Sequence, residues 1–139
     1  MKELVRFGVA MEEGLLRRFD RHLRARGYSN RSEAIRDLVR DALVQELVQQ
    51  GERRVIGTIT LVYSHDTHEL TERLNHLQHD SHAAIVCSSH VHLDAHNCVE
   101  VLIVRGKAAQ VRKIADRLIG IKGVKHGKLV LTATGKELA

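Results

Sequence analysis

The sequence contains few cysteines and no long hydrophobic stretch, and both absences restrict the class of protein. Only two cysteines occur among its 139 residues, so the disulfide framework of a small secreted domain is not expected. No apolar run approaches the ~18 residues of a membrane-spanning helix. The opening residues Met1–Arg6 do not resemble a signal peptide. We therefore expect a cytoplasmic protein without a membrane partner, built as one ordinary domain or two very small ones.

Lysine and histidine are scarce in the first part of the chain. Before Val55, Lys2 is the only lysine and His22 the only histidine, whereas arginine is common. After Val55, lysine is at least as common as arginine, and nine of the ten histidines occur there. Guanidinium groups suit phosphate, and imidazoles suit transition metals. The asymmetry indicates two modules with different tasks, and the net charge of +5 permits DNA as a partner without requiring it.

The first module, expected over residues 1–50, has a strand followed by two helices. Residues 4–11 alternate between apolar and other side chains, which is typical of a half-buried strand. A helix is expected over 12–26. A second helix begins after Asn30, a good N-cap with Glu33 three residues further on, and it fades at a linker over 49–51.

One strand and two helices cannot form a complete domain in a single chain. A lone strand leaves both edges unpaired, and the apolar stripes of the helices stay uncovered. Pairing the strand with its copy from a second chain solves both problems, so an obligate dimer is expected. This is the ribbon-helix-helix plan of DNA-binding proteins, in which a two-stranded ribbon enters the major groove of double-stranded DNA.

The outer face of the expected ribbon carries one strong hydrogen-bonding side chain, Arg6. We expect it to contact the edge of a base, with guanine favoured, and the alternative is a solvated surface charge. The two further outward positions are Gly8 and Ala10, which lack hydroxyl groups. Sequence specificity would then depend on Arg6, on methyl contact or on DNA shape.

Phosphate contacts are expected at the start of the second helix. Asn30 and Arg31 offer free backbone N–H groups at the positive end of the helix dipole. Arg36 is expected to add a further phosphate contact.

The second module, expected over residues 54–139, alternates strands and helices. Their order is βαββαβ, the ferredoxin-like or ACT-like arrangement, in an α+β chain. The expected strands cover residues 54–63, 83–92, 98–105 and 123–132, and the expected helices cover 67–79 and 108–119. Two of the strands are apolar on consecutive positions, which suggests that helices cover one face of the sheet and another subunit covers the other.

Four side chains of this module form a candidate transition-metal site. His90 and His92 stand two apart on a strand and so point to one face. Cys98 follows a short turn, and His79 precedes the strand. Three imidazoles and a thiolate suit nickel, copper or zinc, and do not suit magnesium or calcium. The alternative is structural histidines and a small buried cysteine.

Other residues near this site have weaker assignments. Glu100 is a candidate to accept a hydrogen bond from a metal-bound histidine, or else a solvated strand carboxylate. Cys87 is out of register with the two strand histidines, and we expect it in the core. Six further histidines are each expected at the surface, with weaker metal sites as the alternative: His65, His68, His76, His82, His96 and His126.

These motifs together resemble the nickel-responsive repressors (NikR). Residues 27–37, Gly-Tyr-Ser-Asn-Arg-Ser-Glu-Ala-Ile-Arg-Asp, are similar to the second-helix signature of that family. Four segments of the second module are similar to the regulatory domain of that family. They are Gln78-His79, His90-Val91-His92, Cys98-Val99-Glu100 and Gly123-Val124-Lys125-His126-Gly127. The resemblance covers essentially the whole chain.

The resemblance implies a homotetramer, a dimer of dimers in which two dimeric DNA-binding modules flank a tetrameric core. It implies one square-planar Ni²⁺ per subunit, held by His90, His92 and Cys98 of one subunit and by His79 of another. Low-spin nickel favours a plane of nitrogen and sulfur donors, whereas zinc prefers a tetrahedron.

The resemblance also bears on the DNA-binding module. Glu33 and Asp37 match positions that, in the family, contribute to a cation site between the two domains when DNA is bound. The alternatives are a cap for Glu33 and a helix-face charge for Asp37. Family members often have threonine or serine where this chain has Gly8 and Ala10.

The sequence therefore predicts a transcriptional repressor, not an enzyme, in which nickel promotes operator binding and controls nickel uptake or metabolism. A regulator that responds to copper, cobalt or zinc is the first alternative. A zinc hydrolase or deaminase is disfavoured because four protein ligands leave no position for water, and no His-x-Glu with Cys-x-x-Cys pair occurs. A nickel-storage protein would not explain the N-terminal strand and capped helix.

Overall fold

The computed structural model describes residues 2–66, 68–80 and 84–138 of the chain. The chain forms two compact units, Met1–Asp41 and Ala42–Ala139. No helix in the described ranges has both the length and the apolar character needed to cross a membrane.

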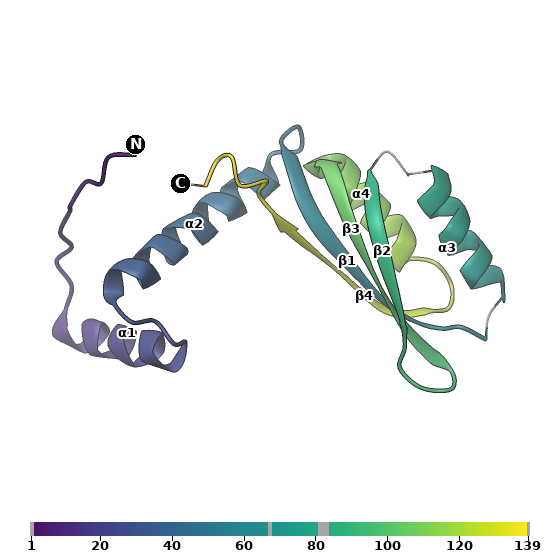
Figure 1. Cartoon of the computed structure of the whole chain (residues 1–139), viewed down its shortest axis with the longest axis horizontal. Helices are drawn as coiled ribbons and strands as arrows, with labels where there is room; N and C mark the ends of the chain where they lie inside the picture. The colour runs from purple at the N-terminus through teal and green to yellow at the C-terminus, as the bar shows by residue number, and fades with distance from the viewer. Residues whose placement is uncertain (1, 67, 81–83, 139) are drawn as a thin grey trace. The chain divides into compact units, whose positions relative to one another are not determined.

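The first unit consists of an extended segment, α1 (Glu13–Ala25) and the first turns of α2 (Arg31–Gln49). The expected strand over residues 4–11 is not formed in the single chain, and this segment is drawn as a coil at the N-terminus in Figure 1. A strand needs a partner backbone, and one chain supplies none here. The apolar side chains Leu4, Val5 and Phe7 are consequently exposed.

The turn between α1 and α2 is fixed by local hydrogen bonds. Gly27 has a φ of +80°, the left-handed conformation that ends many helices. The backbone N–H of Tyr28 donates to the carbonyl of Leu23 at 3.0 Å. The Asn30 side-chain oxygen accepts the backbone N–H of Glu33 at 2.9 Å, which confirms the predicted N-cap.

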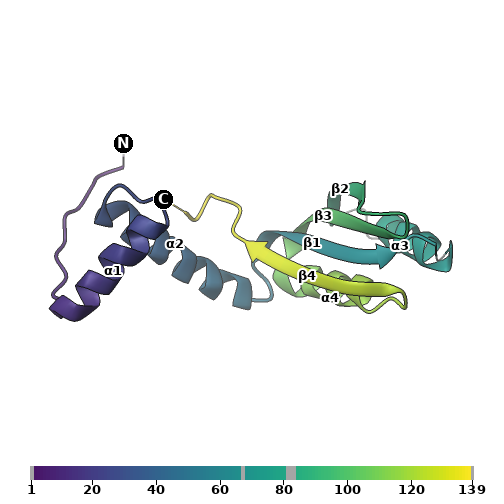
Figure 2. The same ribbon diagram turned by 90° about the horizontal axis from the view of Figure 1, so that it is seen from below.

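The second unit contains the remaining helices and strands. They are β1 (Arg54–Ser64), α3 (His68–Asp80), β2 (Ile85–His92), β3 (Asn97–Lys107), α4 (Ala108–Ile119) and β4 (Val124–Thr132). The sheet has the strand order β2-β3-β1-β4, and every neighbouring pair is antiparallel, as Figure 2 shows. This is the predicted ferredoxin-like arrangement.

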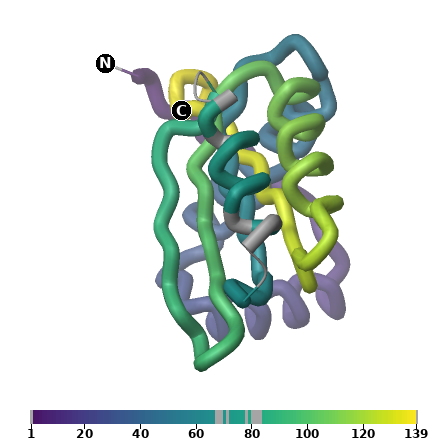
Figure 3. The backbone as a smooth tube through the Cα atoms, turned by 90° about the vertical axis from the view of Figure 1, so that its right-hand side faces the viewer, coloured from purple at the N-terminus to yellow at the C-terminus, as the bar shows by residue number. Residues whose placement is uncertain are grey.

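Helices cover one face of this sheet. Alternate side chains of β1 and β3 are buried on it, among them Ile59, Leu61 and Leu102. They pack with Leu74 of α3 and Leu118 of α4, and Figure 3 shows the two helices side by side. A strict two-residue alternation on central strands follows when only one face is covered within the chain.

The last turns of α2 belong to this second core. Val44 and Val48 are buried with the sheet residues, and the guanidinium of Arg112 donates to the carbonyl of Val48 at 2.7 Å. The functional domain limits, 1–50 and 54–139, stay a prediction.

The opposite face of the sheet is open in the single chain. Val91 and Val130 on this side are more than half exposed. Cys87 pairs with Ile103 on the same side and is exposed. The expectation that Cys87 lies in the core was wrong, because the core of one chain forms only on the face that the helices cover.

Candidate metal centre

The register of three strands brings the metal-binding residue types together. Cys98 of β3 lies directly between Tyr63 of β1 and His92 of β2. His65 follows β1 by one residue, and its backbone N–H donates to the carbonyl of His96 at 3.0 Å. This bond continues the pairing of β1 with β3 and places His65 beside Cys98.

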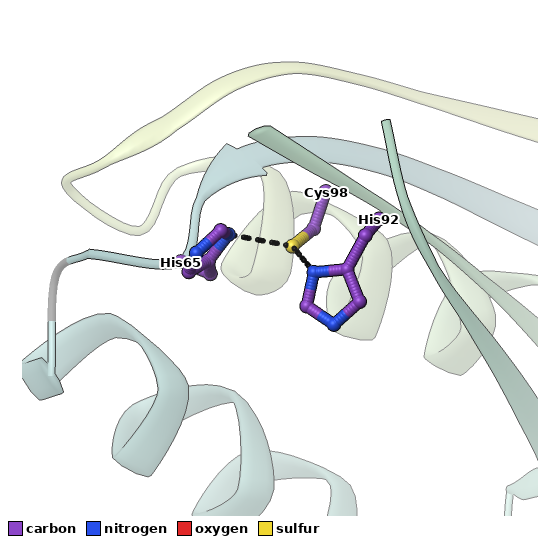
Figure 4. Close-up of side chains that lie close together, drawn as sticks. All are labelled: His65, His92 and Cys98. Atoms are coloured by element: carbon purple, nitrogen blue, oxygen red, sulfur yellow. Dashed lines mark hydrogen bonds between the residues drawn. The ribbon is translucent and has the colours of Figure 1, made fainter. Parts of the chain in front are cut away.

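His65, His92 and Cys98 form a compact ligand cluster. The Cys98 sulfur is 3.2 Å from Nδ1 of His65 and 3.4 Å from Nδ1 of His92. Both contacts are drawn as dashed lines in Figure 4. One ligand atom from each residue lies within 4.8 Å of the other two. Two imidazoles and a thiol at these distances suit a transition-metal ion.

The cluster differs sharply in exposure across its members. Cys98 is fully buried, His65 is half-buried and His92 is exposed. Burial raises the pKa of the Cys98 thiol, and the negative charges of Asp94, Asp66 and Glu100 raise it further. The residue is therefore a neutral thiol at neutral pH. A metal that binds as a thiolate complex must release this proton, so metal affinity should fall with acid.

His90 lies one row away from the cluster on the same face. It pairs with Glu100 of β3, just as His92 pairs with Cys98, so the predicted common face of the two histidines is present. The ring centroids of His90 and His92 are 5.0 Å apart. Nδ1 of His90 lies 3.0 Å from the hydroxyl of Tyr63.

The Tyr63 hydroxyl links His90 to a buried carboxylate. It donates to Glu100 at 3.2 Å, and Glu100 is only 7% exposed. Burial and the charge of Glu100 raise the pKa of Tyr63, so its proton is retained. A hydroxyl that donates to Glu100 can accept from Nδ1–H of His90, and this tautomer leaves Nε2 of His90 available for a metal.

Sequence reasoning missed His65 as a member of this cluster and assigned it to the surface. Its spacing of two from Tyr63 was the available signal, because i, i+2 positions share a face when a strand continues. The other ring nitrogen of His65, Nε2, is 3.6 Å from Asp66, and Asp66 contacts Nδ1 of His96 at 2.7 Å.

His79 does not join the cluster within the described part of one chain. It lies on α3 and is exposed. Its predicted role as a ligand from another subunit stays a prediction. Among the other histidines, His76, His96 and His126 are exposed, while His82 lies outside the described residues and the side chain of His68 is likewise not described.

The predicted DNA contacts all lie in the first unit. Arg6, Gly8 and Ala10 are exposed on the extended segment, and no atom lies within 4 Å of a Cβ added at Gly8. Arg31 and Arg36 are exposed on α2. These positions are accessible to DNA.

The predicted cation-site residues Glu33 and Asp37 line a pocket of about 310 Å³. Glu33 accepts a hydrogen bond from the Ser29 hydroxyl at 3.0 Å. Asp37 accepts from the Tyr28 hydroxyl at 2.7 Å and pairs with Arg40 at 3.0 Å. A cation there stays a prediction, since these oxygens have protein partners in the single chain.

Comparisons with known proteins match both parts of the chain. A family model described as the NikR C-terminal nickel-binding domain matches residues 56–132, and one described as a ribbon-helix-helix protein of the copG family matches residues 5–46. A protein of Geobacter metallireducens named as a nickel-responsive regulator is 58% identical over 138 residues, with 99% of each chain covered.

Relatives from other organisms carry the same name. A nickel-responsive regulator of Thermococcus onnurineus is 54% identical over 136 residues, covering 98% of this chain and 99% of the relative. The solved structure of an uncharacterized protein from Thermotoga maritima aligns with a TM-score of 0.52 at 18% identity, covering 57% of this chain and 98% of that one. This last likeness concerns the fold alone.

The Tyr63 hydroxyl gives a first test of the site. We expect Tyr63→Phe to weaken binding of Ni²⁺ roughly 10- to 100-fold, because His90 loses the partner that orients its ring. Competition with a chelator measures this affinity. The control, Tyr28→Phe, removes a tyrosine hydroxyl from the first unit and should leave the nickel affinity unchanged. Equal nickel affinity in the Tyr63→Phe protein and the unmodified chain would contradict the role of Tyr63.

Proposed function

The chain belongs to the NikR family of nickel-responsive regulators, and we propose that it represses transcription when nickel occupies a site shared between subunits. It is a DNA-binding regulator with a ribbon-helix-helix region and a nickel-binding domain. The observation that carries the proposal is the cluster around Cys98, which lies within the segment matched by the nickel-binding model.

The proposed ligands are His90, His92 and Cys98 of one subunit and His79 of another, with one Ni²⁺ per subunit. Three of them lie on adjacent strands and one face, with the sulfur of Cys98 3.4 Å from His92. A plane of three nitrogens and one thiolate sulfur suits low-spin nickel. Bound nickel would supply a fixed link between the elements that hold its ligands.

We assign His65 to the thiolate rather than to the metal. Its Nδ1 lies 3.2 Å from the Cys98 sulfur, within hydrogen-bonding distance. A donor to a ligating sulfur reduces its negative charge and fixes its orientation, as partners of metal ligands commonly do. Its Nε2 is 3.6 Å from an oxygen of Asp66, beyond hydrogen-bonding distance, so the sulfur is the closer partner of the ring.

The proposed assembly is a cytoplasmic homotetramer, a dimer of dimers. A groove of about 780 Å³ lies between the extended segment and the two helices, and its apolar lining includes Phe7, Val9 and Ile35. A second copy of this unit would fill the groove and pair the two segments as a ribbon. The open face of the sheet, with Val91 and Val130, supports a second contact between copies.

Nickel can act as a signal only if it binds the DNA-competent arrangement more tightly than the alternative. A ligand from a second subunit provides this difference, because the complete site exists only when the two subunits are correctly placed. We propose that nickel binding stabilises that placement and that operator affinity rises as a result.

The direct test is a DNA titration with nickel, zinc, copper or no metal. The probe is a duplex that the unmodified protein selects from a random pool in the presence of nickel. We expect nickel to raise affinity about 5- to 150-fold, the usual range for coupled sites. Cys98→Ala should abolish both this rise and the nickel–thiolate absorption band. An unchanged absorption band in Cys98→Ala would contradict the assignment of Cys98 as a ligand. Stronger activation by copper or zinc would show that nickel is not the preferred effector.

Histidine variants separate ligands from their partners. We expect His79→Ala and His90→Ala to lose the square-planar nickel spectrum. His65→Ala should keep that spectrum with affinity reduced about 10- to 100-fold, because a partner and not a ligand is removed. His22→Ala, on α1, is the control and should change neither property. The reverse pattern, with His65 essential and His79 dispensable, would replace His79 by His65 in the ligand set.

Arg6 gives the corresponding test of DNA readout. We expect Arg6→Ala to lower affinity for the selected duplex by at least about tenfold, since a good arginine–base contact contributes ~1–3 kcal/mol and each dimer carries two copies. Nickel affinity should be unchanged. Lys113→Ala removes one charge from α4 and serves as the control. Comparable affinity of Arg6→Ala and the unmodified chain at matched salt would count decisively against base contact by Arg6.

A further inference from the structure

Helix α1 carries more arginine than its packing requires. Its apolar side, with Leu16, Phe19 and Leu23, faces the interior of the first unit. Its exposed surface carries Arg17, Arg18, Arg21 and Arg24, whereas Glu13 and Asp20 are its only acidic residues. Such a surplus of one charge on one helix favours an acidic partner.

The side of α1 that carries Asp20 lies beside the start of α2. The guanidinium of Arg31 donates to both carboxylate oxygens of Asp20, from Nε and from a terminal nitrogen, each at 2.8 Å. This bidentate contact lowers the pKa of Asp20. Arg31 is the first residue of α2, where backbone N–H groups have no helical partner and can bind phosphate.

Arg17 and Arg24 lie on the same side of α1 as Asp20. They are three residues before it and four residues after it, so each is its neighbour one turn away on the helix surface. Arg18 is two residues from Asp20 and points ~160° away from it at ~100° per residue. The Asp20 side of α1 therefore presents two arginines next to the start of α2, and Arg18 is excluded from this group.

Local contacts hold both arginines along the helix. A terminal nitrogen of Arg17 contacts the carboxylate of Glu13, and Nε of Arg24 donates to the backbone carbonyl of Asp20 at 3.2 Å. A guanidinium has five N–H donors, so one such contact leaves capacity for another acceptor. Its planar fork matches a phosphate better than a lysine ammonium does.

We propose that Arg17 and Arg24 extend the phosphate-binding surface of Arg31 onto α1 and contact the DNA backbone beside the site that the ribbon reads. The inference rests on the DNA-binding function proposed above. Phosphate contacts carry no base information. The pair therefore raises affinity for every DNA sequence and steepens its salt dependence, and leaves the choice of operator to the ribbon.

The test measures the salt dependence of DNA binding by the nickel-loaded, full-length protein. The variant is Arg17→Gln/Arg24→Gln, since glutamine has a helix propensity close to that of arginine. Two duplexes are used, the one selected by the unmodified protein and a shuffled duplex of equal length, between ~50 and ~200 mM salt. Circular dichroism and nickel affinity report whether the variant is folded.

We expect the slope of log affinity against log salt to become shallower by ~0.9 for each phosphate that the variant no longer neutralises. Affinity for both duplexes should fall by the same factor, which leaves their ratio unchanged. The control, Arg18→Gln/Arg117→Gln, removes equal charge from the far side of α1 and from α4, and should keep the original slope. An unchanged slope in Arg17→Gln/Arg24→Gln, or an equal change in the control, would overturn the proposal.

The unmodified protein separates this result from the proposed function. If it shows no nickel-dependent preference for the selected duplex, the proposed function fails, whatever the slopes are. If it shows that preference and the Arg17→Gln/Arg24→Gln slope is unchanged, only the contact by Arg17 and Arg24 fails. A loss of preference confined to the double variant would indicate base readout by these arginines and would also contradict the proposal.

Discussion

The candidate metal centre depends on the position of β3 between β1 and β2. Because β3 pairs with both neighbours, Cys98 lies opposite Tyr63 on one side and His92 on the other. A shift of one residue in either pairing would move the histidines of β2, or Tyr63, to the opposite face. The alternation that buries Cys98 and Glu100 in the core is the same alternation that orients His90 and His92, so the site and the core are specified by one register.

Much of this arrangement could be predicted from the sequence, because it depends on short-range periodicity. The His90-Val91-His92 spacing indicated a common face, and Asn30 indicated a helix start, since both signals lie within a few residues. The strand over residues 4–11 is different, because its pattern is clear but its hydrogen-bonding partner is absent from the single chain. His65 was missed because its role depends on the pairing of β1 with β3, and Cys87 was misplaced because one face of the sheet is open.

The unformed strand and the misplaced cysteine have a common physical origin. In each unit of the single chain, apolar surface is left uncovered: the side chains of the extended segment in the first, and Val91 and Val130 in the second. The nickel site proposed above is incomplete in the same sense, because its fourth ligand would come from another subunit. In the proposed assembly other copies would supply a ligand, a strand and the cover of a sheet face. Metal binding and assembly would then be thermodynamically coupled, and each would stabilise the other.

The buried Cys98 thiol makes metal binding depend on the release of a proton. Burial raises the pKa of Cys98, so in the metal-free protein its neutral form contributes stability at pH values below the unfolded-state pKa of the thiol. That contribution is lost as the pH rises through the folded-state pKa. Nickel bound at the proposed site would require the thiolate and would therefore displace a proton that the fold retains. Because His65 lies 3.2 Å from the sulfur, it is placed to stabilise the thiolate once the proton has left. The burial of Cys98 thus opposes ionisation of its thiol in the metal-free protein, and a bound metal ion would offset this cost by stabilising the thiolate.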